Sequence, residues 1–445
     1  MASILFIVFS GQASAIFDSF LYSHQERYKE LKKSNENPTN HFVIETQWDN
    51  GGHTGFMLDF YDWLKDNDKF KNVFPDNFIM PPPMGDLKTQ ISRWAGYLIK
   101  NENGKNISQS MGYRFAAISQ ALAELTELIN TLKEQNLAIF SDEDNMNILN
   151  TFSDLYKEFS QDKEMNHSVG NLFLSFLYFY SFKRLKHLDQ TLYEHHHQVF
   201  FNFLKDLSLV PRGCRFEFLI DGRYKLSADT FDGIHIPSEH HFDDYVGDIP
   251  ANPETYSITA VDGEDLDHKF REMINVSDIV VIPPGSLSNW MPLINKFKAQ
   301  LLNKPIIWVV NSFYHVSEVN LRGQIEYMRK LKLDPIVLAP KVDTPFDGLD
   351  SETRKMFEES YSNQQKKPVN FNETLANFQD LKVLRCIPLK ELEAGEGGIK
   401  YKSEFIDILL SQLSLKAEGY ENTETIYELS EKIVKSLLSQ ELKVN

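Results

Sequence analysis

Two aspartates stand where a carboxylate could take part in ligand or metal chemistry. Asp49 follows the apolar run at 42–44 and precedes the glycine-broken loop at 51–55, whose backbone amides side chains cannot crowd. Asp86 follows a proline run at 81–83 and Gly85, just before helix-forming residues from 87 onward. Carboxylate oxygens are ligands that Mg²⁺ prefers, so we expect Asp86 as a metal ligand and both aspartates as catalytic residues.

Three glycines follow strand-like runs and precede helical ones, and two of them have a serine beside them. Such junctions present backbone N–H groups and the positive end of a helix dipole to phosphate. Any single junction of this kind is more often an ordinary turn, but three in one chain favour a nucleotide or phosphorylated ligand. Neither the dinucleotide fingerprint nor the P-loop pattern is present. The residues are Ser10, Gly11, Gly51, Gly285 and Ser286.

The histidines are weaker candidates for a metal site. Residues 195–197 are all histidine but lie in a predicted helix, where consecutive side chains point around the axis. His240 and His241 have acidic neighbours on a predicted loop, although acidic loops are usually only solvated. No serine or cysteine nucleophile occurs in a recognisable catalytic context. Metal binding at the histidines is therefore the less favoured interpretation.

Composition narrows the class of protein. The chain has 445 residues, 42% of them hydrophobic and 13% aromatic, which predicts a globular protein with a substantial core. A formal charge of −17 disfavours a surface for nucleic acid, while a local pocket for one nucleotide remains compatible with it. The 2 cysteines cannot build a disulfide framework, which favours a reducing compartment.

The first fifteen residues allow two interpretations. The apolar run and Ala13-Ser14-Ala15 imitate a signal peptide, but the basic n-region is missing. The interpretation we favour is a buried strand over 4–9 that turns into a helix over 13–31. Because no other apolar stretch approaches the ~20 residues of a membrane span, we expect a soluble cytoplasmic protein with no membrane partner.

The elements that must position the candidate residues alternate along the chain. We expect strands at 4–9 and 43–47 to pair in parallel across a connecting helix. Helices are predicted at 87–98, 113–135 and 146–159, with a polar break at 101–104. The run 168–182 is apolar nearly all round and predicts a buried central helix. Further helices are predicted at 188–207, 266–275, 287–297, 321–331, 405–415 and 425–442, and further strands at 215–220, 224–227, 233–236, 279–282, 306–310, 335–338 and 383–387.

This alternation predicts an α/β fold with a Rossmann-like, mainly parallel sheet and flanking helices. The stretch near 100–165 is a helical excursion, and the last hundred residues are a C-terminal α/β extension. We therefore divide the chain into a nucleotide-binding α/β domain over 1–345 and an extension over 346–445 packed on the same domain. In such folds, ligands bind at the carboxyl ends of the strands.

Five short motifs occur in a characteristic order, and together they resemble those of the CofD/YvcK family. That family pairs 2-phospho-L-lactate transferases with YvcK-type gluconeogenesis or morphogenesis factors that bind nucleotide sugars. The resemblance implies a Rossmann-like fold and a nucleoside diphosphate or its conjugate as ligand. The motifs are WDNGGHTG at 48–55, PPPMGD at 81–86, HSVGNLF at 167–173, VVIPPGSL at 280–287 and IIWVVNS at 306–312.

The resemblance also implies roles for residues at the matching positions. Asp86 would face the acceptor or the metal, Asn171 would support the site from the central helix, and the loop at 285–286 would meet phosphate. The remaining residues would line the ligand site: Gly51, Gly52, Thr54 and Gly55.

Three positions depart from the family pattern. The usual glycine-rich first loop is reduced to residues 10–13, reading SGQA. Asn50 replaces the second aspartate of the YvcK pattern, and His53 stands where a small hydroxyl residue is usual. These departures do not change the expected fold. They change residues of the ligand site, so they affect the activity that the resemblance implies.

Three functions are consistent with these residues. The first is a CofD-like transferase that moves a phosphate-linked group from a nucleoside diphosphate to an acceptor alcohol, which requires charge neutralisation and a positioned acceptor. The second is a YvcK-type protein that binds a nucleotide sugar without turning it over. The third is a scaffold with a vestigial pocket. The expected ligand is a nucleotide or nucleotide sugar, and a homo-oligomer is among the open alternatives.

Overall fold

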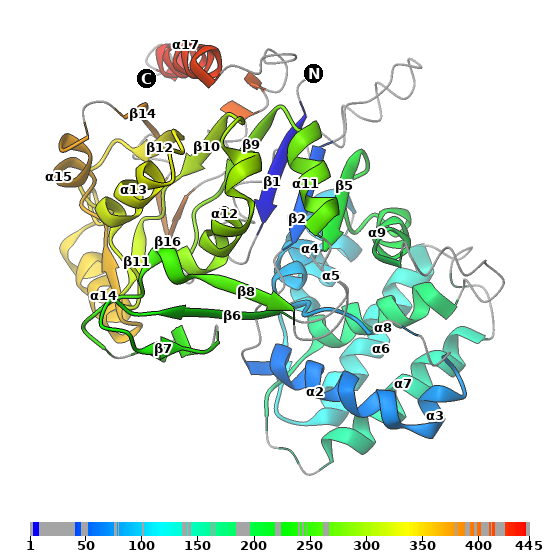
Figure 1. The fold of residues 1–445 in the computed structure, drawn as a ribbon. Coiled ribbons are helices and arrows are strands. Elements are labelled where there is room, and N and C mark those ends of the chain that lie inside the picture. The colour runs from blue at the N-terminus through cyan, green and yellow to red at the C-terminus, as the bar shows by residue number, and fades with distance from the viewer. Residues whose placement is uncertain are drawn as a thin grey trace, which may run out of the picture.

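The computed structural model describes residues 3–8, 41–45, 52–74, 78, 80–99, 102–135, 140, 144–161, 163, 165–183, 196–218, 224–238, 241–242, 244–245, 247–260, 267–378, 381–387, 392–395, 398–401, 409–410, 412–413 and 423–441. A parallel sheet and a group of helices beside it dominate these residues (Figure 1). Among them, no helix combines the length and the apolar character that a membrane-spanning segment needs.

Among the described residues, the central sheet has seven strands in the order β14-β12-β10-β9-β1-β2-β5. Every neighbouring pair is parallel, which confirms the predicted α/β class with a Rossmann-like sheet. The strands are β1 (Ile4–Val8), β2 (His41–Glu45), β5 (Cys214–Phe218), β9 (Ile279–Ile282), β10 (Ile306–Val309), β12 (Ile336–Pro340) and β14 (Val383–Ile387).

The predicted parallel pairing of the first two strands is confirmed. Leu5 lies opposite Phe42 and Val8 opposite Glu45. β1 also pairs in parallel with β9 on its other side, so the first strand lies inside the sheet. The chain adds β2 and then β5 on one side of β1, and β9, β10, β12 and β14 on the other. The strand order therefore reverses between β1 and β9, and this is the topological switch point at which open α/β sheets bind ligands.

The sheet is covered on both faces because its strands are apolar on both. In β9, Ile279 and Val281 belong to one core, while Val280 and Ile282 belong to the other. Successive side chains of a strand point to opposite faces, so a strand buried on both faces is a continuous apolar run. One face packs against α11 (Asp267–Val276), α12 (Leu287–Leu301), α13 (Leu321–Lys330) and α15 (Phe371–Ala376).

The other core continues into a group of helices that Figure 1 shows beside β2 and β5. Its centre is α8, in which every residue from Val169 to Phe182 is buried, as its apolar sequence predicts. The group consists of α2 (Gly52–Asp66), α3 (Asp68–Lys71), α4 (Gly85–Leu98), α5 (Glu102–Met111), α6 (Ile118–Gln135), α7 (Asp144–Ser160), α8 (Val169–Lys183) and α9 (His196–Asp206).

Two helix predictions in this group are wrong. Of the polar break predicted at 101–104, residues 102–104 form the start of α5. Gly104 allows close packing there, since a Cβ would lie 2.7 Å from the Ala95 carbonyl oxygen of α4. The helix predicted from 113 begins only at Ile118, since β3 (Arg114–Phe115) pairs with β4 (His167–Ser168). Tertiary pairing overrides local propensity at this point.

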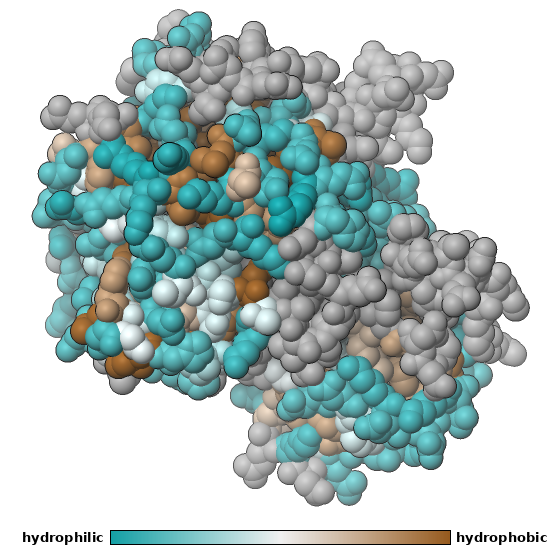
Figure 2. Space-filling model, viewed as in Figure 1, coloured by the Kyte–Doolittle hydropathy of each residue, from teal (hydrophilic) through white to brown (hydrophobic). Residues whose placement is uncertain are grey.

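Smaller sheets flank the main one. An antiparallel sheet has the order β7-β6-β8, and two further pairs are β11 with β13 and β15 with β16. The face drawn in Figure 2 is mainly hydrophilic. The elements are β6 (Tyr224–Asp229), β7 (His235–Ile236), η2 (Pro253–Thr255), β8 (Ser257–Ala260), β11 (Phe313–His315), β13 (Lys366–Pro368), β15 (Leu392–Gly395) and β16 (Gly398–Tyr401).

The C-terminal hundred residues include α14 (Ser351–Asn363), β14 and α17 (Thr423–Glu441). β14 is the edge strand of the central sheet next to β12, and Ile426 of α17 belongs to the same core as β9 and β10. The division of the chain at residue 345 stays a prediction. The helix predicted at 405–415 lies mostly outside the described residues.

Candidate functional site

The strands that precede the three predicted glycine loops are neighbours. β2, β1 and β9 lie side by side in parallel, so their carboxyl ends share one edge of the sheet. The loop at 283–286 follows β9 at that edge, and α2 begins at Gly52, shortly after β2. The described residues thus place the start of α2 and the loop after β9 at one edge of the sheet, after two strands that are separated by β1. Four predicted site residues lie outside the described residues: Ser10, Gly11, Asp49 and Gly51.

The loop after β9 is held by a carboxylate that sequence reasoning missed. Gly285 and Ser286 are half-exposed, and Ser286 is the N-cap residue of α12 but makes no side-chain capping bond. Instead, Glu318 Oε1 accepts a 2.6 Å hydrogen bond from the Leu287 amide, and Oε2 accepts one of 3.3 Å from His315. A bond from the Ser288 amide adds to these. The first turn of α12 is therefore already occupied by a carboxyl group of the chain itself.

Glu318 is unusual because it is a buried acid. Burial raises its pKa to about 7, against the effect of the three backbone hydrogen bonds and of Lys366, which lower it. A phosphate at this junction would thus meet the amides of Gly285 and Ser286 and the Ser286 hydroxyl, and not the first-turn amides of α12. Nothing in the sequence around 318 signals this contact.

On the helical side of the site, Thr54 and Asn171 come together. Thr54 is the third residue of α2 and Asn171 the third of α8. Both are buried, and Asn171 Nδ2 donates to Thr54 Oγ1 across 3.5 Å. Asn171 Oδ1 has no hydrogen-bond partner. Gly52 and Gly55 lie in the same first turn of α2, so the structure groups these predicted residues around the start of that helix.

A histidine–tyrosine–histidine chain adjoins this pair. Tyr156 of α7 has its hydroxyl 3.0 Å from His53 Nε2 and 2.7 Å from His167 Nδ1. Burial lowers the pKa of His53 to about 3, with further lowering from His167 and two nearby cations, Arg114 and Lys88. Burial also lowers the pKa of His167. Both rings are therefore neutral near pH 7, and each has one nitrogen left without a partner.

The start of α4 reaches the same region through Lys88. A Cβ on Gly170 would lie 2.5 Å from Lys88 Cγ and 2.6 Å from the Met111 carbonyl oxygen. Glycine at 170 is therefore what lets the lysine stem lie across the first turn of α8. Three helices, α2, α4 and α8, thus begin near one another. The cationic side chains of Lys88 and Arg114 add to the positive charge at the starts of these helices.

The structure corrects the placement of Asp86. α4 begins at Gly85 with Met84 as its N-cap residue, so Asp86 is the second helical residue. Asp86 is therefore not the N-cap residue of this helix. The aspartate is nevertheless in the first turn, where the helix dipole favours an anion. Its side chain lies outside what the structure describes.

The described residues give no independent support for a metal site. No group of three histidine, cysteine or acidic side chains gathers among them. His197 is buried, with its ring 4.9 Å from that of Phe218, which indicates a packing role in α9. Of the acidic loop around 240, residues 239, 240 and 243 lie outside the described part of the chain.

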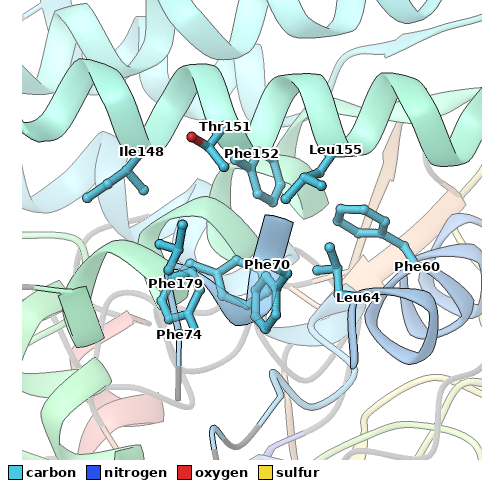
Figure 3. Close-up of a pocket in the computed structure, with 10 residues that line it drawn as sticks. Phe60, Leu64, Phe70, Phe74, Ile148, Thr151, Phe152, Leu155 and Phe179 are labelled. Carbon is cyan, nitrogen blue, oxygen red and sulfur yellow. The ribbon is translucent and has the colours of Figure 1, made fainter. Parts of the chain in front are cut away.

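A separate space lies between α2, α3, α7 and α8 (Figure 3). Its volume is about 20 Å³, enough for roughly one water molecule. Figure 3 shows a lining of aromatic and aliphatic side chains together with Thr151, and the surface of the space itself is apolar. A buried water needs two to four polar partners, so this space is a dry packing gap and not a ligand site.

Comparison with solved structures matches the fold. Two crystal structures of protein BH3568 from Bacillus halodurans have a fold similar to that of this chain. One has a TM-score of 0.53 at 12% identity, covering 92% of this chain and 98% of that chain. The other, described as a member of the UPF0052 family, has a TM-score of 0.55 at 13% identity, covering 91% and 98%. The chain shares the fold of this UPF0052 protein. No protein-family model matches the chain, and no curated protein does.

Several residues of the site had little or no signal in the sequence. His167 lies in the motif at 167–173, but Tyr156 lies in an ordinary amphipathic helix and Arg114 in a short strand that local propensity does not predict. Lys88 is in a predicted helix and becomes notable only because Gly170 lies beneath it. Contacts across α2, α4, α7 and α8 create the site, and a single sequence does not show them.

Proposed function

We propose that this protein binds a nucleoside diphosphate or its conjugate at the carboxyl edge of the central sheet, beside the switch point between β1 and β9. The observation that carries the proposal is the shared carboxyl edge of the consecutive strands β2, β1 and β9, because the sequence predicts a glycine loop after each of these strands. The shared fold adds support, since UPF0052 is a designation of the CofD/YvcK family.

The phosphates would be held by backbone amides and by charge. Gly285 and Ser286, which are half-exposed residues, would offer backbone amides and a hydroxyl, and the start of α2 would offer further N–H groups. Lys88 and Arg114, which act electrostatically on His53, would balance the negative charge of the ligand. A strongly acidic chain with cations at this position is suited to a small anion and not to a long polyanion.

The reaction we propose for this site is transfer of a phosphate-linked group to an acceptor alcohol. The acceptor oxygen would bond to phosphorus, the acceptor would lose its proton, and a nucleoside monophosphate would leave. Asp86, in the first turn of α4, and Asp49, after β2, are the proposed catalytic carboxylates, and Mg²⁺ is the proposed ion. Among the residues that the structure describes, no group of three histidine, cysteine or acidic side chains could hold the ion.

A non-catalytic, YvcK-like role in sensing a nucleotide sugar is the second candidate. The contact between Glu318 and the start of α12 favours it, because the amides of Leu287 and Ser288 are already satisfied. Fewer fixed donors then remain to stabilise charge that develops in a transition state.

Thermal unfolding with nucleotides tests binding. A ligand at one hundred times its Kd stabilises the folded state by about 2.7 kcal/mol. We expect nucleoside diphosphates and their sugar conjugates to raise the unfolding midpoint, and Ser286→Ala to reduce the increase. Glu352→Gln, an exposed change on α14, is the control. A midpoint that no nucleotide changes, with or without Mg²⁺, would defeat the proposal. Release of nucleoside monophosphate in the presence of an alcohol separates transferase from sensor.

A further inference from the structure

Five residues on the helical side of the site are linked in a closed circuit, and we call these five, together with Ser168 next to His167 in the chain, the polar ring. His53 and Thr54 are consecutive in α2, and Thr54 accepts from Asn171 at 3.5 Å. Asn171 lies four positions after His167 at the junction of β4 and α8. The Tyr156 hydroxyl closes the circuit by bonding both histidines. The members are His53, Thr54, Tyr156, His167, Ser168 and Asn171.

Four polar atoms of the polar ring are buried without a hydrogen-bond partner. They belong to side chains that are each at least nine-tenths buried. Buried polar groups are almost always hydrogen-bonded, and each orphan costs about 1–3 kcal/mol. Four in one circuit therefore indicate a site that a ligand completes. The atoms are His53 Nδ1, His167 Nε2, Ser168 Oγ and Asn171 Oδ1.

The bonding pattern fixes what the ring offers to a ligand. Because the Tyr156 hydroxyl has one proton, it donates to one histidine and accepts from the other. Both imidazoles are neutral, so of the two nitrogens that do not bond Tyr156, His53 Nδ1 and His167 Nε2, one carries a proton and the other does not. The ring thus presents one N–H donor and one bare ring nitrogen. Asn171 Oδ1 is a second hydrogen-bond acceptor, and the Ser168 hydroxyl can donate or accept a hydrogen bond.

Positive charge surrounds the ring. Lys88 and Arg114 both lower the pKa of His53, which shows that they act on it electrostatically. Lys88 crosses Gly170 at the start of α8, and Arg114 pairs with Ser168 between β3 and β4. The first turns of α2 and α8 add the positive ends of two helix dipoles. A ligand that suits these groups is anionic and also carries a hydrogen-bond donor for Asn171.

We propose that the polar ring binds a small hydroxyl-bearing anion, such as a sugar phosphate, with its anionic group toward Lys88 and Arg114 and a hydroxyl donating to Asn171 Oδ1. This rests on the proposed function only in that the anion would be the acceptor or the non-nucleotide part of the conjugate. A free metabolite and a part of a nucleotide conjugate share this chemistry, so the experiment tests both sources.

Three small probes separate the parts of the recognition. Inorganic phosphate supplies the anion, glycerol the hydroxyl, and glycerol 3-phosphate both. We expect the full-length protein to bind glycerol 3-phosphate at least tenfold more tightly than phosphate, by calorimetry and by the unfolding midpoint, and glycerol hardly at all. Equal affinity for phosphate and glycerol 3-phosphate, or binding of neither, overturns the proposal.

Two variants place the site. Lys88→Met keeps an aliphatic stem over Gly170 and removes the charge, and Asn171→Asp puts a negative charge at the proposed hydroxyl contact. Each should weaken binding of glycerol 3-phosphate about tenfold or more. Lys163→Met is the matched control: Lys163 lies outside the ring, its Nζ 3.3 Å from the Phe159 ring centroid, and its loss should change affinity less than twofold. Equal weakening in all three variants overturns the assignment of the site to the polar ring. If Asn171→Asp does not fold, Lys88→Met still tests this assignment, because it changes a half-exposed residue.

The same measurements with a nucleoside diphosphate and a nucleotide sugar keep the two proposals apart. Nucleotide binding without binding of glycerol 3-phosphate overturns this inference and leaves the proposed function standing. Binding of glycerol 3-phosphate without any nucleotide binding supports this inference and overturns the proposed function. A nucleotide sugar that competes with glycerol 3-phosphate identifies the conjugate as the source, and absence of competition identifies a free metabolite.

Discussion

Glu318 places a carboxylate oxygen 2.6 Å from the amide of Leu287, at the start of α12 and beside the switch point of the sheet. The two residues are 31 positions apart. A helix start beside the carboxyl edge is where a Rossmann-like fold commonly receives a ligand phosphate. Here the chain's own acid takes that position, and it ties the segment after β11 to the loop at 285–286. The shape of the candidate phosphate site thus depends on a group that can lose or gain a proton near neutral pH.

Glu318→Gln should change how stability depends on pH. The folded protein keeps a proton on Glu318 up to about pH 7, whereas the unfolded chain releases it near 4.5. This contribution to stability is therefore present below pH 4.5 and is lost as pH rises through 7. The raised pKa corresponds to roughly 3 kcal/mol. In urea unfolding from pH 4.5 to 8, the wild type should lose about that much relative to Glu318→Gln.

The control for this measurement is Glu326→Gln, on the exposed part of α13, where Glu326 pairs with Arg322. Its pH profile should run parallel to that of the wild type. Parallel profiles for Glu318→Gln as well would show that Glu318 does not titrate in this range.

The sequence predicts the sheet better than it predicts the site. Strands such as β9 and β10 are short apolar runs bounded by turn residues, so their pattern is sufficient to locate them. The buried helix α8 is apolar on every side, which leaves one interpretation. By contrast, Gly104 carries the signal of a break but serves close packing of α5 on α4, and only the three-dimensional contact distinguishes the two.

The site depends on contacts that no local pattern encodes. Thr54 and Asn171 could be paired in advance only through the motifs at 48–55 and 167–173. Tyr156 has no comparable signal, because a tyrosine on the buried side of an amphipathic helix is commonplace. Glu318 is missed for the same reason, since burial and not its neighbours in sequence makes it notable.

Tyr156→Phe should be among the more destabilising conservative changes in the chain. It removes one hydroxyl but leaves two buried ring nitrogens, on His53 and His167, without partners. At about 1–3 kcal/mol for each orphaned group, we expect a loss of roughly 2–4 kcal/mol in urea unfolding. Tyr61→Phe is the matched control, because within the described part of the chain the Tyr61 hydroxyl bonds Ser175 alone, and Ser175 also bonds the Asn171 carbonyl. A loss for Tyr156→Phe no larger than for Tyr61→Phe would contradict the bridging role.

Thr151→Val should stabilise the protein slightly. Thr151 of α7 is half-exposed and is among the residues that line the apolar space between α2, α3, α7 and α8, and valine would replace its hydroxyl with a methyl group of similar size (Figure 3). Both side chains are β-branched, so helix propensity changes little. We expect a gain of about 0.5–1 kcal/mol in unfolding free energy. Thr126→Val on α6 is a useful comparison, because its hydroxyl bonds the Leu122 carbonyl, and it should gain less.

Asp86→Asn tests the proposed carboxylate. Asp86 is the second residue of α4, so loss of its charge near the positive helix end should cost about 0.3–1 kcal/mol of stability. If the carboxylate also orients the ligand or holds Mg²⁺, the variant should lose most Mg²⁺-dependent nucleotide affinity. Glu352→Gln makes the same change in the first turn of α14 and should cost similar stability without affecting nucleotides. Calorimetric titration of all three proteins, with Mg²⁺ and with a chelator, provides the comparison. Unchanged nucleotide affinity in Asp86→Asn would restrict Asp86 to stabilising its helix.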